Sequence, residues 1–308
     1  MRKPDLFIVG APKSGTTSLY EHLAGHPDVY MSPAKEPLYF CPDVGNPIRR
    51  RFHYPDDEAR YLGLFSGARS QKRLGEASTR YLISHQAPIL IRDFQPRPYI
   101  VAMLRNPVDM VYALHNERVS QGHEEIENFG AALAADEDRY AGRERRSGMQ
   151  PLSGGYRAEV RYAEQLQRWF DVFGREHCRV IIFDDFVSDP AREFERLLHF
   201  LEVDPTYRPT TFDPRNASHR QRAWVRGIVD SGPGDWATHK ALPALIGERR
   251  KAILAYRFRH SRLNRRQGPR PPLDQELRSQ LEKEFRPDVQ RLGEMFDRDL
   301  VSLWFGPS

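Results

Sequence analysis

The amino-acid sequence predicts an α/β fold of three layers, in which a central parallel sheet has helices on both faces. Two observations lead to this prediction. Short, continuous apolar runs alternate with longer amphipathic stretches, which is typical of strands that are buried on both faces. The first apolar run ends in a glycine-rich turn that is followed by a helical pattern, the arrangement of a P-loop.

Four apolar runs are expected to form strands, at residues 6–10, 73–77, 99–104 and 179–185. Helices are expected at residues 17–24, 107–121, 156–173, 191–201 and 275–296. The helix near residue 191 has a proline in its first turn and apolar residues at helical spacing, which indicates a packing role. Because ligands of open α/β sheets bind beyond the carboxyl ends of the strands, the turns after the first and third strands are candidate sites.

We expect one domain over residues 1–308, because a chain of 308 residues with 39% hydrophobic residues can bury the core of one large α/β domain. Two segments differ from the rest. Residues 122–155 contain few large apolar side chains and are expected to be a mobile or peripheral excursion. Residues 240–270 contain ten Lys or Arg residues and one acidic residue, Glu248.

The net charge of +5 favours anionic partners, such as nucleotides, acidic glycans, nucleic acid or a membrane surface, and does not choose among them. No apolar run approaches the roughly 20 residues of a membrane helix, and the first strand begins too early for a signal peptide, so a cytoplasmic location is expected. Cys41 and Cys178 are the only cysteines, too few for a disulfide framework and not spaced as metal ligands.

The first turn, Gly-Ala-Pro-Lys-Ser-Gly-Thr-Thr, is expected to bind a phosphate group. Its glycines allow tight backbone geometry, and the amides of Ser14 to Ser18 would point from a helix N-terminus toward an anion. Lys13 precedes Gly15 by two residues, whereas the nucleotide triphosphatase loop places its lysine after the second glycine. The residue order therefore argues against that class of loop.

The same order resembles the 5′-phosphosulfate loop of sulfotransferases that use 3′-phosphoadenylyl sulfate (PAPS). Four further segments are similar to the family in the same order, namely HPDVYMSPAKEPLYF, GEASTRYL, IVAMLRNPVDMVYALH and the helix, strand and Asp-Pro turn of residues 164–190. The terminal FRPDVQRLGEMFDRDLVSLW also looks like the family's last helix and Trp. The resemblance covers roughly residues 5–304, is closest to the heparan-sulfate and bacterial carbohydrate branch, and implies the matching P-loop fold.

The resemblance implies PAPS as the sulfuryl donor, adenosine 3′,5′-bisphosphate (PAP) as the product and no required metal. Sulfuryl transfer needs a phosphate cradle, a cation at the bridging oxygen and a base for the acceptor hydroxyl. We assign Lys13 as the cation, and the cradle to Ser14, Gly15, Thr16, Thr17 and Ser18, in which the two threonine hydroxyls also bind the 5′-phosphate.

Arg105 follows an apolar strand directly, where its guanidinium could hold the 3′-phosphate. The family has a helping Ser eight residues later, but this chain has Ala113. Ser120, Arg220 and Arg222 are the candidates to replace that serine.

Glu36 matches the carboxylate that the carbohydrate branch uses as general base. Pro37 fixes its backbone, Tyr39 and Phe40 offer an apolar wall, and Lys35 is a neighbouring charge. The rival bases are His85, His115 and His123, because the aryl and steroid branch uses His. Part of the family has a Lys where Ala77 stands, and Glu76 beside it is a minor candidate that could organise the cleft through hydrogen bonds.

The expected acceptor is a hydroxyl of a sugar or other small molecule, without nucleic acid as a partner, and the oligomeric state is not predicted. Residues 122–155 and 215–272 are expected to choose the acceptor, since 215–272 matches the family poorly. The basic stretch at 240–270 is interpreted either as a clamp for an anionic acceptor or lipid surface, or as a solvated helix face.

Two other functions stay open. One is a nucleotide kinase, for which Asp184 and Asp185 at the end of the fourth strand would hold magnesium. The other is a non-catalytic nucleotide or polyanion binder, which would keep Arg105 and have no need of Glu36.

Overall fold

The computed structural model describes residues 2–44, 55, 57–136, 155–212, 220–221, 265–266 and 272–306. Its strands are β1 (Leu6–Gly10), β2 (Val29–Met31), β3 (Arg73–Ala77), β4 (Tyr99–Leu104), β5 (Cys178–Ile182), β6 (Arg220–Gln221) and β7 (Arg265–Arg266). Its helices up to the middle of the chain are α1 (Thr16–Ala24), α3 (Glu58–Gly63), α4 (Ala87–Phe94), α5 (Pro107–Gln121) and α6 (Phe129–Ala134). The later helices are α8 (Gly155–Ala158), α9 (Tyr162–Phe173), the 3-10 helix η1 (Arg175–His177), α10 (Phe183–Ser188), α11 (Pro190–Phe200), α15 (Gln275–Phe296) and α16 (Leu300–Phe305).

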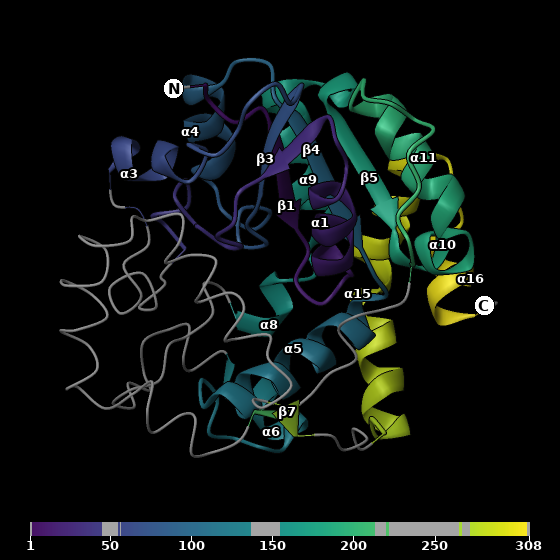
Figure 1. Ribbon diagram of the computed structural model, residues 1–308. Helices are drawn as coiled ribbons and strands as arrows, with labels where there is room; N and C mark the ends of the chain where they lie inside the picture. The colour runs from purple at the N-terminus through teal and green to yellow at the C-terminus, as the bar shows by residue number, and fades with distance from the viewer. Residues whose placement is uncertain are drawn as a thin grey trace, which may run out of the picture.

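The central sheet has five strands in the order β2-β3-β1-β4-β5, and every neighbouring pair is parallel. The first strand of the chain therefore lies in the middle, between β3 and β4 (Figure 1). Parallel strands present their carboxyl ends at one edge of a sheet, so the segments that follow β1, β3 and β4 meet there. β6 and β7 form a separate antiparallel pair.

The two faces of the sheet bury two different sets of side chains, as the alternation along β1 shows. Phe7 and Val9 belong to one hydrophobic core, and Leu6 and Ile8 belong to the other. The core of Leu6 and Ile8 is covered by α1, α10 and α11, whereas residues of α4, α5, α9, α15 and α16 cover the opposite face. In Figure 1, α1 lies in front of the strands and α9 behind them. The predicted three-layer α/β fold is confirmed.

Most of the expected elements are present, and the differences have physical causes. The strand expected at 179–185 ends at Ile182, where α10 begins with Asp184 and Asp185 in its first turn. Acidic side chains stabilise a helix N-terminus, which favours a helix at this point. The helix expected at 156–173 is two helices, α8 and α9. β2, with three residues, is too short to leave a periodic signal.

The described part of residues 122–155 packs against the fold. Phe129, Ala132 and Leu133 of α6 are buried in the same core as α5. Helix α6 is therefore part of the core, and the expectation of a peripheral excursion is wrong for this helix. The remainder of this segment lies outside the described residues, as does nearly all of 215–272, and the acceptor-binding role of both stays a prediction.

Among the residues that the structure describes, no helix combines the length and the apolar character that a bilayer span needs.

Candidate active site

The P-loop connects β1 to α1 and leaves the start of the helix open to an anion. Gly15 precedes the helix, and no side chain caps it. The amide of Leu19 makes the first helical hydrogen bond, to the carbonyl of Gly15 at 3.2 Å. The amides of Thr16, Thr17 and Ser18 therefore have no acceptor within the helix, and an N-terminus of this kind binds phosphate.

Two residues shape the loop itself. Gly15 has φ of 91°, and a Cβ atom there would lie 3.1 Å from the ring of Phe183, so the position favours glycine on both counts. The side chain of Ser14 is fully buried, and its hydroxyl donates to the carbonyl of Pro12 at 3.2 Å. That hydroxyl proton is therefore used within the loop.

Lys13 belongs to the P-loop, and its side chain contacts helix α5. Its backbone is left-handed, with φ of 57°, and its ammonium forms an ion pair with Glu117 at 3.0 Å. Glu117 was not predicted, and because it lies 104 residues away along the chain, no local pattern could have indicated it. Its carboxylate neutralises part of the charge that Lys13 brings to the site.

Arg105 lies beside the P-loop, as the sequence predicts. It follows β4, and its Nη1 donates to the carbonyl of Lys13 at 3.4 Å. Its guanidinium lies over the ring of Phe183, 5.0 Å from the centroid, and its side chain is 28% exposed. The guanidinium is therefore held at the loop, and part of it is accessible to a ligand.

A second guanidinium lies close to Arg105. Asp109, in the first turn of α5, accepts from Arg278 of α15 at 2.6 Å, and its other oxygen is 3.8 Å from Arg105. No local sequence pattern links Arg278 to this site, because α15 is far along the chain from α5.

The residues considered as replacements for the family's serine have different environments. Ala113 is buried and has no polar group to offer. Ser120 donates its hydroxyl to the carbonyl of Glu117 at 2.7 Å, on its own helix. The backbone of Arg220 forms β6, which contacts α5 and pairs with β7 (Figure 1). Arg222 lies outside the described residues.

The carboxylate of Glu36 is held next to the start of the P-loop. It accepts from the backbone amide of Thr79 at 2.9 Å and from the Thr79 hydroxyl at 3.1 Å, and it pairs with Lys35 at 3.2 Å. The backbone amide of Glu36 donates to the carbonyl of Ala77 at 2.8 Å, and the amide of Leu82 donates to the carbonyl of Val9 in β1 at 2.8 Å. The segment after β3 therefore contacts both Glu36 and the end of β1.

Glu76, at the end of β3, is fully buried and accepts from three hydroxyl groups. Tyr61 and Tyr81 each donate at 2.8 Å, and Ser78 donates at 2.6 Å. Burial raises the pKa of Glu76 to about 7, although the three hydroxyl hydrogen bonds act in the opposite direction. The sequence analysis identified neither tyrosine.

The histidines that rival Glu36 as bases have other surroundings. His115 is buried against Phe129 and Tyr156, and its Nε2 lies 2.8 Å from the carbonyl of Ile126. His85 is exposed before α4, where its amide donates to Asp43, and the backbone of His123 bonds to Arg118 beyond the end of α5. His115 thus has the surroundings of a core residue.

The aspartates after β5 are engaged by the C-terminal helices. Asp184 accepts from the indole of Trp304 at 2.9 Å. Arg298 donates both terminal nitrogens to Asp185, one of them at 2.7 Å. These contacts fasten the C-terminal end of the chain to the edge of the sheet.

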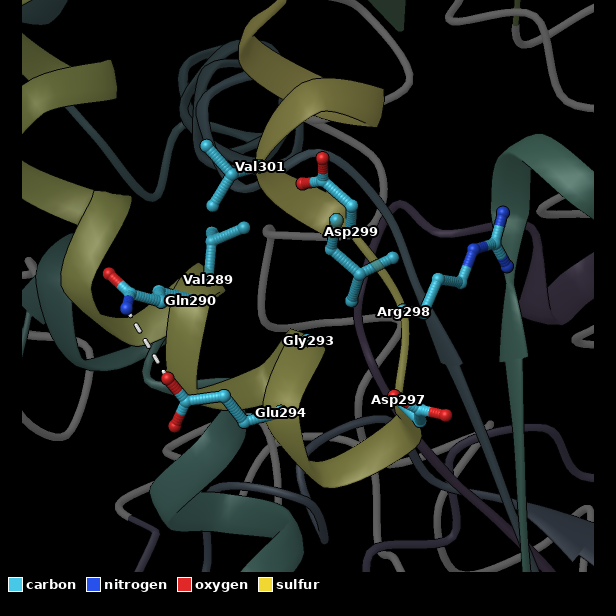
Figure 2. Close-up of a pocket in the computed structure, with 9 residues that line it drawn as sticks. Val289, Gln290, Gly293, Glu294, Asp297, Arg298, Asp299 and Val301 are labelled. Carbon is cyan, nitrogen blue, oxygen red and sulfur yellow. Dashed lines mark hydrogen bonds between the residues drawn. The ribbon is translucent and has the colours of Figure 1, made fainter. Parts of the chain in front are cut away.

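A hollow at the turn between α15 and α16 belongs to none of these groups (Figure 2). Glu294, Asp297 and Asp299 line it, while the side chain of Arg298 extends away from it toward Asp185. Three carboxylates make the hollow unsuitable for an anionic nucleotide.

Fold and site together define an α/β protein whose central strand leads into a loop and an uncapped helix N-terminus, with Lys13 in that loop and Arg105 beside it. A family model described as the sulfotransferase domain matches residues 3–216. The chain belongs to this family of enzymes, which transfer sulfuryl groups, and the resemblance predicted from the sequence is confirmed.

Three similar proteins agree with this assignment. The chain is 27% identical to carbohydrate sulfotransferase 15 of Homo sapiens over 252 residues, which cover 66% of this chain and 44% of that protein. It is 30% identical to heparan sulfate glucosamine 3-O-sulfotransferase 6 of Mus musculus over 205 residues, 65% of this chain and 52% of that protein. The chain thus spans about half the length of these relatives. The crystal structure of a sulfotransferase from Alicyclobacillus acidocaldarius matches with a TM-score of 0.73 and 28% identity, over 99% of this chain and 100% of that one.

Proposed function

We propose that this protein transfers a sulfuryl group from PAPS to a hydroxyl group of a carbohydrate or other small-molecule acceptor. The observation that carries the proposal is the arrangement at the carboxyl edge of the sheet. Lys13 follows β1, Arg105 follows the neighbouring β4, and Glu36 is bound by Thr79 just after β3 on the other side. A cation, an anion-binding fork and a base thus lie at the carboxyl ends of three neighbouring strands.

The residues around the loop fit the donor nucleotide. The free amides at the start of α1 and the hydroxyls of Thr16 and Thr17 would hold the 5′-phosphate. The partly exposed guanidinium of Arg105 would hold the 3′-phosphate. PAPS supplies an activated sulfuryl group when it is bound.

Two side chains, Glu36 and Lys13, and the backbone amides of the loop act during the transfer. Glu36 accepts the proton of the acceptor hydroxyl, whose oxygen forms the new bond to sulfur. The bond between sulfur and the bridging oxygen breaks, and its electron pair stays on the 5′-phosphate of PAP. Lys13 and the amides of the loop stabilise the negative charge that develops there.

The named relatives support a sugar as the acceptor, because the two protein names describe a carbohydrate and a heparan sulfate glucosamine sulfotransferase. Residues 122–155 and 215–272 stay the predicted acceptor-choosing segments, and the cytoplasmic location stays a prediction.

The two alternatives have less support. A kinase of the type considered would hold magnesium with Asp184 and Asp185, but these side chains bind Trp304 and Arg298. A non-catalytic binder would have no need of Glu36, yet Glu36 adopts a left-handed backbone with φ of 60°. Such a conformation is costly in a residue other than glycine and is concentrated at functional sites.

Two measurements test the proposal. Transfer of labelled sulfate from PAPS to a panel of sugars, phenols and lipids should label at least one hydroxyl acceptor. Calorimetry should show tighter binding of PAP than of ATP with magnesium. The sulfotransferase assignment is wrong if ATP with magnesium binds more tightly, and the catalytic assignment is wrong if PAP binds but no acceptor is labelled.

A further inference from the structure

The loop that carries Glu36 has an unfavourable backbone conformation. Glu36 and Leu38, on either side of Pro37, have φ of 60° and 54°. A left-handed residue other than glycine costs roughly 1–2 kcal/mol, so the surroundings must hold these two residues in place. What holds the loop also determines where the carboxylate of Glu36 lies.

Three contacts hold the residues that follow Pro37. The amide of Leu38 donates to the hydroxyl of Ser78 at 3.0 Å, and the amide of Phe40 donates to the hydroxyl of Tyr81 at 3.2 Å. Between them, the ring of Tyr39 stacks on the ring of Tyr61, with centroids 4.5 Å apart and planes 10° from parallel.

The same three partners converge on Glu76. Ser78, Tyr61 and Tyr81 each donate a hydroxyl proton to its carboxylate. Above its pKa of about 7, the Glu76 carboxylate is ionised and only accepts hydrogen bonds, so it fixes the direction of each hydroxyl proton. The oxygens of Ser78 and Tyr81 are then left to accept from the amides of the loop. Glu76 thus orients the hydroxyl groups that accept from the amides of Leu38 and Phe40, although it makes no hydrogen bond to the loop in this network.

The segment after Glu76 also holds the other end of Glu36. Thr79 follows Ser78 directly, and it donates two hydrogen bonds to the Glu36 carboxylate. Both the loop backbone and the carboxylate of Glu36 are therefore anchored to residues 78–81.

We propose that Glu76 is a positioning residue for the general base: by orienting the hydroxyls of Ser78, Tyr61 and Tyr81, it fixes the loop that presents Glu36 to the acceptor. This inference rests on the proposed function. Glu76 touches neither donor nor acceptor in this role, and it acts through Glu36.

The variant Glu76→Gln tests the proposal with little change of volume. The Gln amide nitrogen must donate, so at least one hydroxyl has to turn its proton away from residue 76, which disturbs the geometry in which Ser78 and Tyr81 accept from the loop amides. Because small misplacements of a catalytic group cost up to about 100-fold, we expect kcat to fall by roughly 10- to 100-fold. The KM for the acceptor and the affinity for PAP should change by less than about 2-fold, since the residues that bind them are untouched.

A double-mutant cycle with Glu36→Gln separates positioning from a general structural role. If Glu76 acts through Glu36, adding Glu76→Gln to Glu36→Gln should lower kcat by less than about 2-fold further. If Glu76 acted independently of Glu36, the fold losses of kcat in the two single variants would multiply in the double variant. Tyr20→Phe is the matched control, because the Tyr20 hydroxyl is also buried and donates to the carbonyl of Ser32 at 2.6 Å, away from this network. It should leave kcat within about 2-fold of the parent.

Amide hydrogen exchange provides a readout that does not require turnover. In Glu76→Gln, the amides of Leu38 and Phe40 should exchange faster than in the parent, while amides of α1 should be unaffected. If the parent transfers no sulfuryl group, the proposed function is wrong. If the parent is active and Glu76→Gln has unchanged kcat, multiplying losses or unchanged exchange at these two amides, the inference about Glu76 is wrong.

Discussion

Asn106 donates its side-chain amide to the carbonyl of Trp304 at 2.7 Å, although the two residues are 198 positions apart. The oxygen of the same side chain caps α5 by accepting from the amide of Val108 at 3.0 Å. Since Asn106 directly follows Arg105, the turn that presents this arginine is fastened to the last helix of the chain. Helix α16 thus helps to place Arg105, the residue proposed to bind the 3′-phosphate.

Replacing Asn106 with Ala should lower both stability and nucleotide affinity. Loss of the cap and of the bond to Trp304 should cost about 1–3 kcal/mol in the free energy of unfolding. PAP should bind several-fold more weakly, because Arg105 loses its support. Asp274→Ala is the control, since Asp274 caps α15 by accepting from Leu277 at 2.9 Å and lies outside this turn. Denaturation and calorimetry measure both effects, and equal loss of PAP affinity in the two variants would contradict the role of Asn106.

Glu36→Gln should lower turnover by about 100-fold or more while PAP affinity stays unchanged, because the variant loses the base and keeps the nucleotide site. Glu117→Gln is the informative comparison, since Glu117 is the carboxylate paired with Lys13. Its turnover should fall by less than that of Glu36→Gln. If steady-state assays show a larger loss of turnover in Glu117→Gln than in Glu36→Gln, the general base is Glu117 and not Glu36.

Lys13→Ala should abolish most transfer without unfolding the protein. The Lys13 and Glu117 side chains are 21% and 36% exposed, so their ion pair contributes no more than about 1 kcal/mol to stability. We expect turnover to fall by at least about 100-fold. Melting and turnover of Lys3→Ala, an exposed lysine near Glu58, provide the control. Activity of Lys13→Ala within a few-fold of the parent would place the cation elsewhere.

Arg105→Ala should reduce recognition of the 3′-phosphate in particular. Affinity for PAP should fall by roughly 10- to 100-fold, the range for losing a charge-assisted hydrogen bond, while affinity for adenosine 5′-monophosphate should change little. Arg92→Ala, on the exposed side of α4, is the control. Equal losses for both nucleotides in calorimetry would show that Arg105 does not bind the 3′-phosphate.

Glu76 should make stability depend on pH. Its pKa is raised by burial from 4.5 to about 7 in the folded protein, so between these values the folded state holds a proton that the unfolded chain releases. Its contribution to the free energy of unfolding therefore falls as pH rises through this window, by up to about 3 kcal/mol. Denaturation of the parent and of Glu76→Gln at pH 5 and pH 8 should show this change in their difference. A difference independent of pH would contradict the raised pKa.

The sequence predicts the sheet well because parallel strands buried on both faces leave continuous apolar runs, as Leu6–Gly10 and Tyr99–Leu104 do. It predicts α10 poorly because the Asp184 and Asp185 that begin this helix follow an apolar strand without a break. Local sequence patterns do not locate the boundary between two elements when a short helix directly follows a strand.

The candidate site divides in the same way. Lys13, Glu36 and Arg105 each stand in a local motif, and the sequence identifies them by residue order. Glu117 and Tyr61 enter the site only through contacts with Lys13 and Glu76 across distant parts of the chain. Such pairs leave no periodic pattern in the sequence, so they can be identified only from the folded structure.

The central position of β1 has a consequence for how such an enzyme can change. The groups proposed to bind the donor, Lys13 and Arg105, follow β1 and β4, whereas Glu36 and its supports lie toward β3. Substitutions on the β3 side can alter the acceptor geometry while the donor pocket keeps its contacts. Acceptor preference can therefore diverge during evolution, or be engineered, while the residues proposed to bind the nucleotide stay unchanged.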